Sequence, residues 1–98
     1  MPKYISLINY TDEGVKTFKD FAERLANARR GADELGVTLD AYYLTIGRFD
    51  AVVIIDAPDN RTAAKVALVN AANGRVRTET LVAFTEAETA TLADELPA

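Results

Sequence analysis

Residues 51 to 55, Ala-Val-Val-Ile-Ile, are apolar at every position and form the longest uninterrupted apolar run of the chain. In a β-strand successive side chains point to opposite faces, so Ala51, Val53 and Ile55 share one face and the two residues between them share the other. A strand in a sheet with one wet face would instead alternate apolar and polar residues. We therefore expect both faces of this strand to be covered.

The rest of the chain reads as an alternation of strands and helices. Stretches rich in β-branched and aromatic side chains predict four strands, at residues 3–10, 37–46, 51–57 and 75–84. Apolar residues spaced three and four apart predict helices, at residues 12–35 and about 60–73, with a short additional C-terminal helix at residues 86–96. Between the second and third strands, Gly47 is interpreted as the first central residue of a two-residue type II′ turn.

This order, β-α-β-β-α-β, is that of the split βαβ, or ferredoxin-like, unit. Right-handed crossovers place both long helices on the same face of a four-stranded antiparallel sheet. A chain of 98 residues is long enough for one modest core, so we expect a single α+β domain over residues 1–98. The second face of the sheet is then bare.

The second predicted strand is also apolar on both faces. Strict alternation groups Leu39 with Tyr43 on one face and places Tyr42 on the other. An exposed apolar patch of this size indicates an interface, and the economical solution is a second copy packed sheet to sheet. We therefore predict a homodimer or a larger even-numbered oligomer. In the alternative, the C-terminal segment covers its own sheet, with Leu92 and Leu96 docking weakly.

The composition excludes several kinds of chemistry. There is no cysteine and no histidine, so thiol catalysis, a Ser-His-Asp triad and haem ligation by either residue are ruled out. No cofactor or metal-binding motif occurs, and we expect neither a cofactor nor a metal. A net charge of −4 opposes contacts with nucleic-acid phosphates. With no apolar run of membrane length and no signal peptide, we expect a cytoplasmic protein without nucleic-acid or membrane partners.

Candidate functional residues are polar groups in or beside the strands, because burying such groups is costly unless they are paired. Arg77 and Glu79 share one face of the fourth strand, where an arginine can hold a carboxylate ligand and a glutamate can accept a proton. Asp50 directly follows the turn, where it can bind a ligand amine. The candidate ligand-binding set is Asp50, Arg77, Glu79, Gly47 and Tyr42. The candidate catalytic residues are Glu79 and Tyr43.

Each candidate also has a structural interpretation. Arg77 and Glu79 can form an ion pair at a sheet edge or dimer seam, and Asp50 can accept hydrogen bonds from backbone amides of the hairpin. The tyrosines can pack in the core or an interface with their hydroxyls satisfied. Thr11 can cap the first helix, or the amides behind it can cradle an anion that Gly14 lets approach closely.

Three stretches, at residues 10–20, 41–59 and 75–84, resemble the GYD family of small bacterial and archaeal proteins. They read YTDEGVKTFKD, AYYLTIGRFDAVVIIDAPD and RVRTETLVAF. The family is named for a Gly-Tyr-Asp motif, and this chain has Phe49 where the family usually has tyrosine. The resemblance implies a dimeric α+β barrel of ferredoxin-like protomers and no particular activity.

Three functions remain compatible with these observations. The favoured one is a homo-oligomeric module that binds a small molecule as a sensor or carrier. The second is a cofactor-independent oxygenase or isomerase of the dimeric α+β barrel type, in which a tyrosine or Glu79 moves a proton. The third is a purely structural assembly protein, which needs no pocket.

Overall fold

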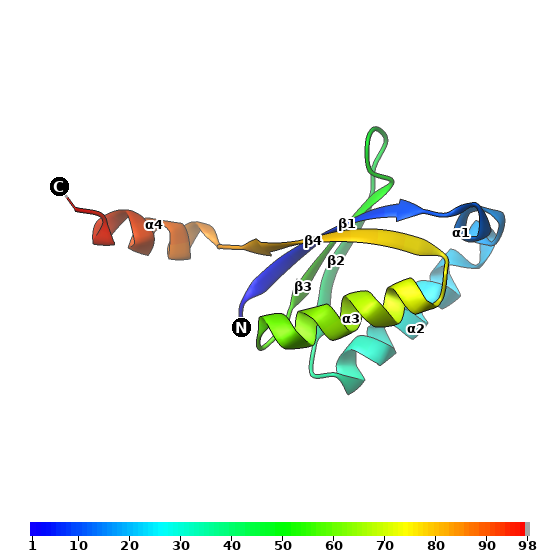
Figure 1. Cartoon of the computed structure of the whole chain (residues 1–98), viewed down its shortest axis with the longest axis horizontal. Helices are drawn as coiled ribbons and strands as arrows, with labels where there is room; N and C mark the ends of the chain where they lie inside the picture. Colours follow the sequence, from blue (N-terminus) through cyan, green and yellow to red (C-terminus); the bar gives the residue numbers. More distant parts are fainter. Residues whose placement is uncertain (98) are drawn as a thin grey trace.

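Four strands form one antiparallel sheet in the computed structural model, which describes residues 1–97. The strands are β1 (Lys3–Tyr10), β2 (Thr38–Leu44), β3 (Ala51–Asp56) and β4 (Val76–Ala83). Their order in the sheet is β2-β3-β1-β4, so β1 and β3 are central (Figure 1). The predicted α+β class and the ferredoxin-like order of elements are confirmed.

The helical elements flank the sheet on one side, apart from the last one. They are α1 (Asp12–Lys16), a 3₁₀ turn η1 (Phe18–Asp20), α2 (Phe21–Glu34), α3 (Asn60–Ala72) and α4 (Glu86–Glu95). Figure 1 shows α2 and α3 on the same face of the sheet, as the crossover rule predicts. We call this face the covered face and the opposite one the open face.

The helix predicted over residues 12–35 is wrong in one respect, because it is interrupted at Thr17. This residue leaves the helical region, with φ −106° and ψ 17°, between α1 and η1. Its hydroxyl donates a hydrogen bond to the Glu13 carbonyl at 3.0 Å, and such local bonds compete with a regular helix. Val15, in α1 before the break, is 61% exposed, although its spacing predicted a core position.

The core lies on the covered face, where β1 and β3 contribute alternate residues. Tyr4 pairs with Ile55 and Ile8 pairs with Ala51 across the two strands, and all four are buried. The Tyr4 hydroxyl donates to Asn60 Oδ1 at 2.7 Å, so its polar end is satisfied by the first residue of α3. The alternation predicted for the third strand is therefore correct.

A β-bulge in β2 overturns the face assignment predicted for that strand. Leu39 pairs with Ile55, whereas Ala41 pairs with Ile54, so Asp40 is an extra residue between them. An extra residue reverses the alternation beyond it. Leu39 and Tyr42 consequently both pack against the core, and Tyr43 lies on the other face with Ala41.

The hairpin between β2 and β3 is wider than the predicted two-residue turn. The Thr45 amide donates to the Asp50 carbonyl at 2.8 Å, and the Thr45 hydroxyl donates to the Phe49 carbonyl at 2.6 Å. Four residues therefore lie between Thr45 and Asp50, the pair that closes the loop. Gly47 has a φ of +132°, which side-chain-bearing residues rarely adopt. The loop projects from the sheet in Figure 1 and leaves Ile46 99% exposed.

The C-terminal helix α4 forms as predicted, but it does not cover the sheet. Its capping box is complete, because the Glu88 amide donates to the Thr85 hydroxyl while the Glu88 carboxylate accepts from the Thr85 amide. These hydrogen bonds lower the pKa of Glu88. Figure 1 shows α4 extending away from the body, and it contains no buried residue. Leu92 and Leu96 are exposed, so the docking considered as an alternative is absent from the described part of the chain.

Candidate functional site

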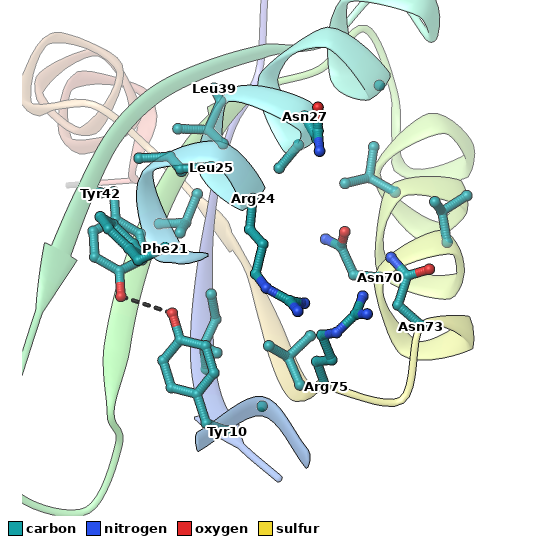
Figure 2. Close-up of a pocket in the computed structure, with 18 of the residues that line it drawn as sticks. Tyr10, Phe21, Arg24, Leu25, Asn27, Leu39, Tyr42, Asn70, Asn73 and Arg75 are labelled. Atoms are coloured by element: carbon teal, nitrogen blue, oxygen red, sulfur yellow. Dashed lines mark hydrogen bonds between the residues drawn. The ribbon is translucent and has the colours of Figure 1, made fainter. Parts of the chain in front are cut away.

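A cavity of about 440 Å³ lies between α2, α3 and the covered face of the sheet. This volume falls within the range of small-molecule pockets, which is roughly 300–1,000 Å³. Tyr42 is the member of the predicted ligand-binding set that lines it, next to Tyr10 and Phe21 (Figure 2). The remaining lining side chains from the sheet are apolar: Ile8, Leu39, Val53 and Val76.

One wall of the cavity is a chain of four aromatic rings. Tyr10 meets Phe18 edge to face with 5.2 Å between the ring centroids, Phe18 stacks on Phe21 at 5.5 Å, and Phe21 contacts Tyr42 at 4.8 Å. The hydroxyls of Tyr10 and Tyr42 lie 2.8 Å apart and share a hydrogen bond. Phe18, the first residue of η1 after the break at Thr17, thus meets Tyr10 at the end of β1.

Tyr10 is held in its neutral form. Burial raises its pKa most, and the hydrogen bond to Tyr42 and the nearby negative charge of Asp50 raise it further. A phenol with a raised pKa is a poor proton acceptor at neutral pH. The pair of hydroxyls is therefore suited to orient a ligand through hydrogen bonds.

Asp50 connects the hairpin to β1. Its carboxylate accepts a hydrogen bond from the Tyr10 amide at 2.9 Å, and its own amide donates to the Ile8 carbonyl at 2.8 Å. The amide that donates to this carboxylate belongs to β1, the neighbouring strand. The sequence had instead suggested amides of the hairpin itself. Gly47 lies farther out, within the exposed loop.

The other candidate residues lie on the open face. Arg77 pairs with Asn9 and Glu79 pairs with Leu7, which alternate with the covered-face residues of β1. Tyr43 pairs with Val52 on the same side and is 60% exposed. The structure therefore separates the predicted set, with Tyr42 in the cavity and Arg77 and Glu79 across the sheet from it.

Two arginines of the cavity were missed by the sequence interpretation. Arg24 comes from α2 and Arg75 from the segment just before β4, and their guanidinium groups point toward one another in Figure 2. The Nε atom of each is buried and has no hydrogen-bond partner among residues 1–97. Leaving a buried donor unsatisfied costs about 1–3 kcal/mol. Arg24 could have been found, because it lies three residues after Phe21 on the apolar stripe of its helix.

The end of the cavity beside Arg75 is closed by a tight backbone contact. A Cβ at Gly14 would collide with the Arg75 carbonyl oxygen, so only glycine fits there. That oxygen accepts a hydrogen bond from the Thr11 amide at 3.0 Å, and the Thr11 hydroxyl donates to the Gly74 carbonyl at 2.7 Å. Thr11 also caps α1, as predicted. The chain's own backbone therefore makes the close approach at Gly14. From the sequence, an anion had been considered in that place.

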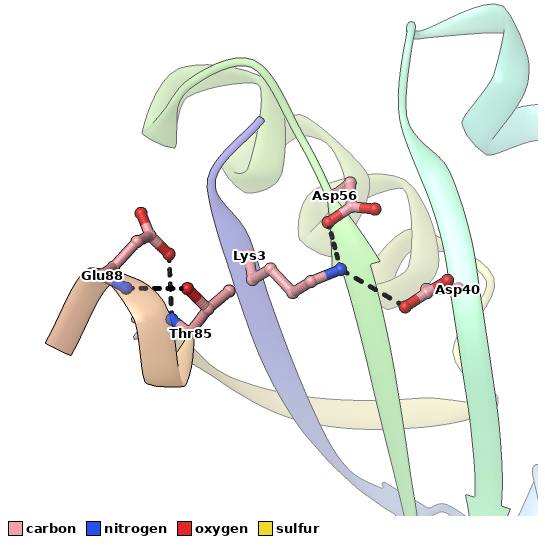
Figure 3. Close-up of polar contacts among 5 residues, drawn as sticks. All are labelled: Lys3, Asp40, Asp56, Thr85 and Glu88. Carbon is pink, nitrogen blue, oxygen red and sulfur yellow. Dashed lines mark hydrogen bonds and ion pairs between the residues drawn. The ribbon is translucent and has the colours of Figure 1, made fainter. Parts of the chain in front are cut away.

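The open face is the second candidate surface. Strand alternation places five large aliphatic residues on it: Ile5, Leu7, Val52, Ile54 and Leu81. At one end Lys3 Nζ lies 2.8 Å from Asp56 and 3.3 Å from Asp40 (Figure 3). The hydrogen bond to Asp56, followed by that to Asp40, raises the pKa of Lys3. The face is therefore an apolar area with a charged border.

Two kinds of site do not occur among the described residues. No group of three or more Asp or Glu side chains is arranged to hold a metal ion within residues 1–97. No helix in that part of the chain is long and apolar enough to cross a membrane.

Comparison with known proteins gives two matches. The family described as the GYD domain matches residues 4–93. A protein of Thermus thermophilus, named glutamine synthetase and cystathionine beta-lyase binding protein, is 34% identical over 89 residues, covering 90% of this chain and 94% of the relative. No solved structure matches the chain. The resemblance stated from the sequence is thus confirmed, and the chain belongs to the GYD domain family.

Proposed function

We propose that this protein is a binding module that pairs with a second copy through the open face and, as an oligomer, docks onto metabolic enzymes. The observation that carries the proposal is the open face itself. It bears five large aliphatic side chains, yet no helix of the described chain covers it. Apolar surface of this kind favours association because burial removes it from water.

Self-association is supported by how the rest of the chain is arranged. α4 has no buried residue and extends away from its own sheet, so it does not compete for the open face. Two antiparallel sheets pack well face to face. A two-fold arrangement would place Arg77 and Glu79 at the seam between copies, where they can pair across it.

Docking onto enzymes is supported by the Thermus relative. Its name describes a protein that binds glutamine synthetase and cystathionine beta-lyase, and it matches nearly the full length of this chain. A homo-oligomer presents several copies of one surface, which strengthens binding to a multi-subunit enzyme without any new contact. We place this activity in the cytoplasm.

A small-molecule role belongs to the same proposal. The cavity beside Tyr42 has the size and apolar lining of a ligand site. A ligand held there would let the module report a metabolite to the enzyme that it binds. The role that we propose for Asp50 and Gly47 is to shape the hairpin next to this cavity.

The assembly is tested by sedimentation velocity on the wild type and on Ile54→Glu. The wild type is expected to sediment as a dimer or larger even-numbered species, and a charge at the centre of the open face is expected to yield a folded monomer. Leu68→Glu is the matched control, because Leu68 is a large aliphatic residue on α3 that is 69% exposed and does not line the cavity. A monomeric wild type, or an unchanged Ile54→Glu oligomer, would refute pairing through this face.

Enzyme docking is tested with purified glutamine synthetase and cystathionine beta-lyase from the organism of this chain. We expect the wild type and Leu68→Glu to co-sediment with at least one of them. Ile54→Glu is expected to bind more weakly because it has lost multivalency. If the oligomer forms but neither enzyme binds, the docking part fails and the pairing part stands.

A further inference from the structure

We propose that the cavity binds an amphipathic organic anion whose carboxylate or phosphate head lies between Arg24 and Arg75. The inference rests on the small-molecule part of the proposed function and adds the residues and the chemical class of the ligand. Neither arginine belongs to the set that the sequence suggested.

The two arginines converge from separate elements of the fold. Arg24 lies on α2 and Arg75 follows the end of α3, and Figure 2 shows the guanidinium groups facing each other. Both Nε atoms are buried and unbonded among the described residues. Two like charges repel, and a buried donor without a hydrogen-bond partner is unfavourable. An anion between them would satisfy both Nε donors and remove the repulsion.

The cavity itself supplies no negative charge. No aspartate or glutamate occurs among the described residues that line it. The ion pairs formed within residues 1–97 both involve Lys3, on the other side of the sheet. This imbalance stands out in a chain whose net charge is −4. Asn70 on α3 and Asn73 just after its end add side-chain amides near the arginines (Figure 2).

The remaining walls define the rest of the ligand. Apart from the arginines, three asparagines and two glycines, the lining is aromatic and aliphatic, with Phe18, Leu25 and Val66 among its members. A guanidinium fork matches the two oxygens of a carboxylate or the oxygens of a phosphate. The site therefore fits a carboxylic acid or phosphate monoester with an apolar body, and it disfavours a cation or a neutral molecule of the same shape.

The test is isothermal titration calorimetry with octanoate, octyl phosphate and octanol, which share one apolar body. We expect one site per chain for an anionic probe, with binding at least about tenfold tighter than for octanol, as charge-assisted hydrogen bonds imply. Arg24→Met and Arg75→Met keep the apolar stem of each side chain and remove its charge. Each is expected to weaken anion binding about tenfold or more.

Two controls separate the pocket from other surfaces. Arg29→Met removes a charge from an exposed position of the same helix that does not line the cavity, so it should leave the affinity unchanged. Ile54→Glu on the open face should also retain octanoate binding, which shows that the probe does not merely coat exposed apolar surface. The relative affinities of octanoate and octyl phosphate identify which head group the site prefers.

Thermal unfolding is the second measurement, and it applies to variants that bind none of the probes. Without ligand, thermal unfolding of the Arg24→Met and Arg75→Met proteins is expected at a higher temperature than wild type, because the repulsion is gone. Lower unfolding temperatures for both would show that the arginines serve the fold and would overturn the proposal. It is likewise overturned if no probe binds the wild type, if octanol binds as tightly as the anions, or if anion affinity survives in both variants.

The outcome is separable from that of the proposed assembly. A wild-type monomer that binds octanoate through Arg24 and Arg75 would refute pairing and leave the site intact. An intact oligomer that binds none of the probes would do the reverse.

Discussion

The two faces of the sheet both carry apolar side chains, but helices cover only one of them. On β3, Ala51, Val53 and Ile55 point to the covered face and are 0%, 7% and 5% exposed, whereas Val52 and Ile54 between them remain partly exposed. Apolar character alone therefore does not say which face the chain buries by itself. The covered face holds the fold together, and the open face has the apolar composition on which the proposed pairing rests.

The largest expected effect separates adjacent residues of β3. Ile55→Ala removes buried methyl groups from the core and should lower the free energy of unfolding by about 2–5 kcal/mol, as such truncations do. Ile54→Ala should cost less than half as much in protein dilute enough to be monomeric, because its side chain lies outside the core of one chain. Urea denaturation of both variants measures the difference.

Protein concentration provides the control for this comparison. In concentrated samples Ile54→Ala should lose stability relative to wild type, since association stabilises only the folded state. Equal losses for the two variants in dilute protein would show that a single chain packs both faces, and the distinction between them would be lost.

Much of the fold could be predicted because it depends on local patterns. The apolar run at residues 51–55 and the helical spacing on either side determine the order of the elements. The bulge at Asp40 could not be read from the sequence, because strict alternation through β2 looks equally apolar in either register. The break at Thr17 was missed for a related reason, since one residue leaves the helical spacing of its neighbours almost intact.

The candidate site was less predictable because it depends on contacts between distant segments. Tyr42 was identified as an aromatic candidate, but the bulge decides that it faces the cavity. Arg24 and Arg75 lie 51 positions apart (75 − 24), and no local pattern joins them. Their missing partners become visible only when both side chains are placed in one cavity.

A smaller effect is expected inside the covered face, at Tyr10. Tyr10→Phe removes the hydrogen bond to the Tyr42 hydroxyl and should lower the free energy of unfolding by about 1 kcal/mol at neutral pH. The substitution also changes how stability depends on pH in the alkaline range. Folded Tyr10 has a raised pKa, so it keeps its proton to higher pH than the unfolded phenol, whose pKa is about 10.

The sign of the pH dependence follows from proton binding. Above about pH 10 the unfolded state releases the proton first, so stability is full below that pH and falls as the pH rises. Tyr10→Phe should therefore show a shallower alkaline loss than wild type in urea titrations between about pH 9 and 11. Tyr43→Phe is the control, because Tyr43 is largely exposed on the open face. Equal slopes of stability against pH for Tyr10→Phe and wild type would show that Tyr10 does not cause the alkaline loss of stability.

The smallest effect on a single chain is expected at the C-terminal arm, residues 85–97, which belongs to neither face. Because α4 buries none of its own residues, a chain that stops at Phe84 should match wild type in dilute protein to within about 0.5 kcal/mol. If the arm instead covers its own open face in solution, the shortened chain should be clearly less stable at every concentration. A loss confined to concentrated samples, with weaker association in sedimentation, would mean that the exposed Leu92 and Leu96 pack on a second copy.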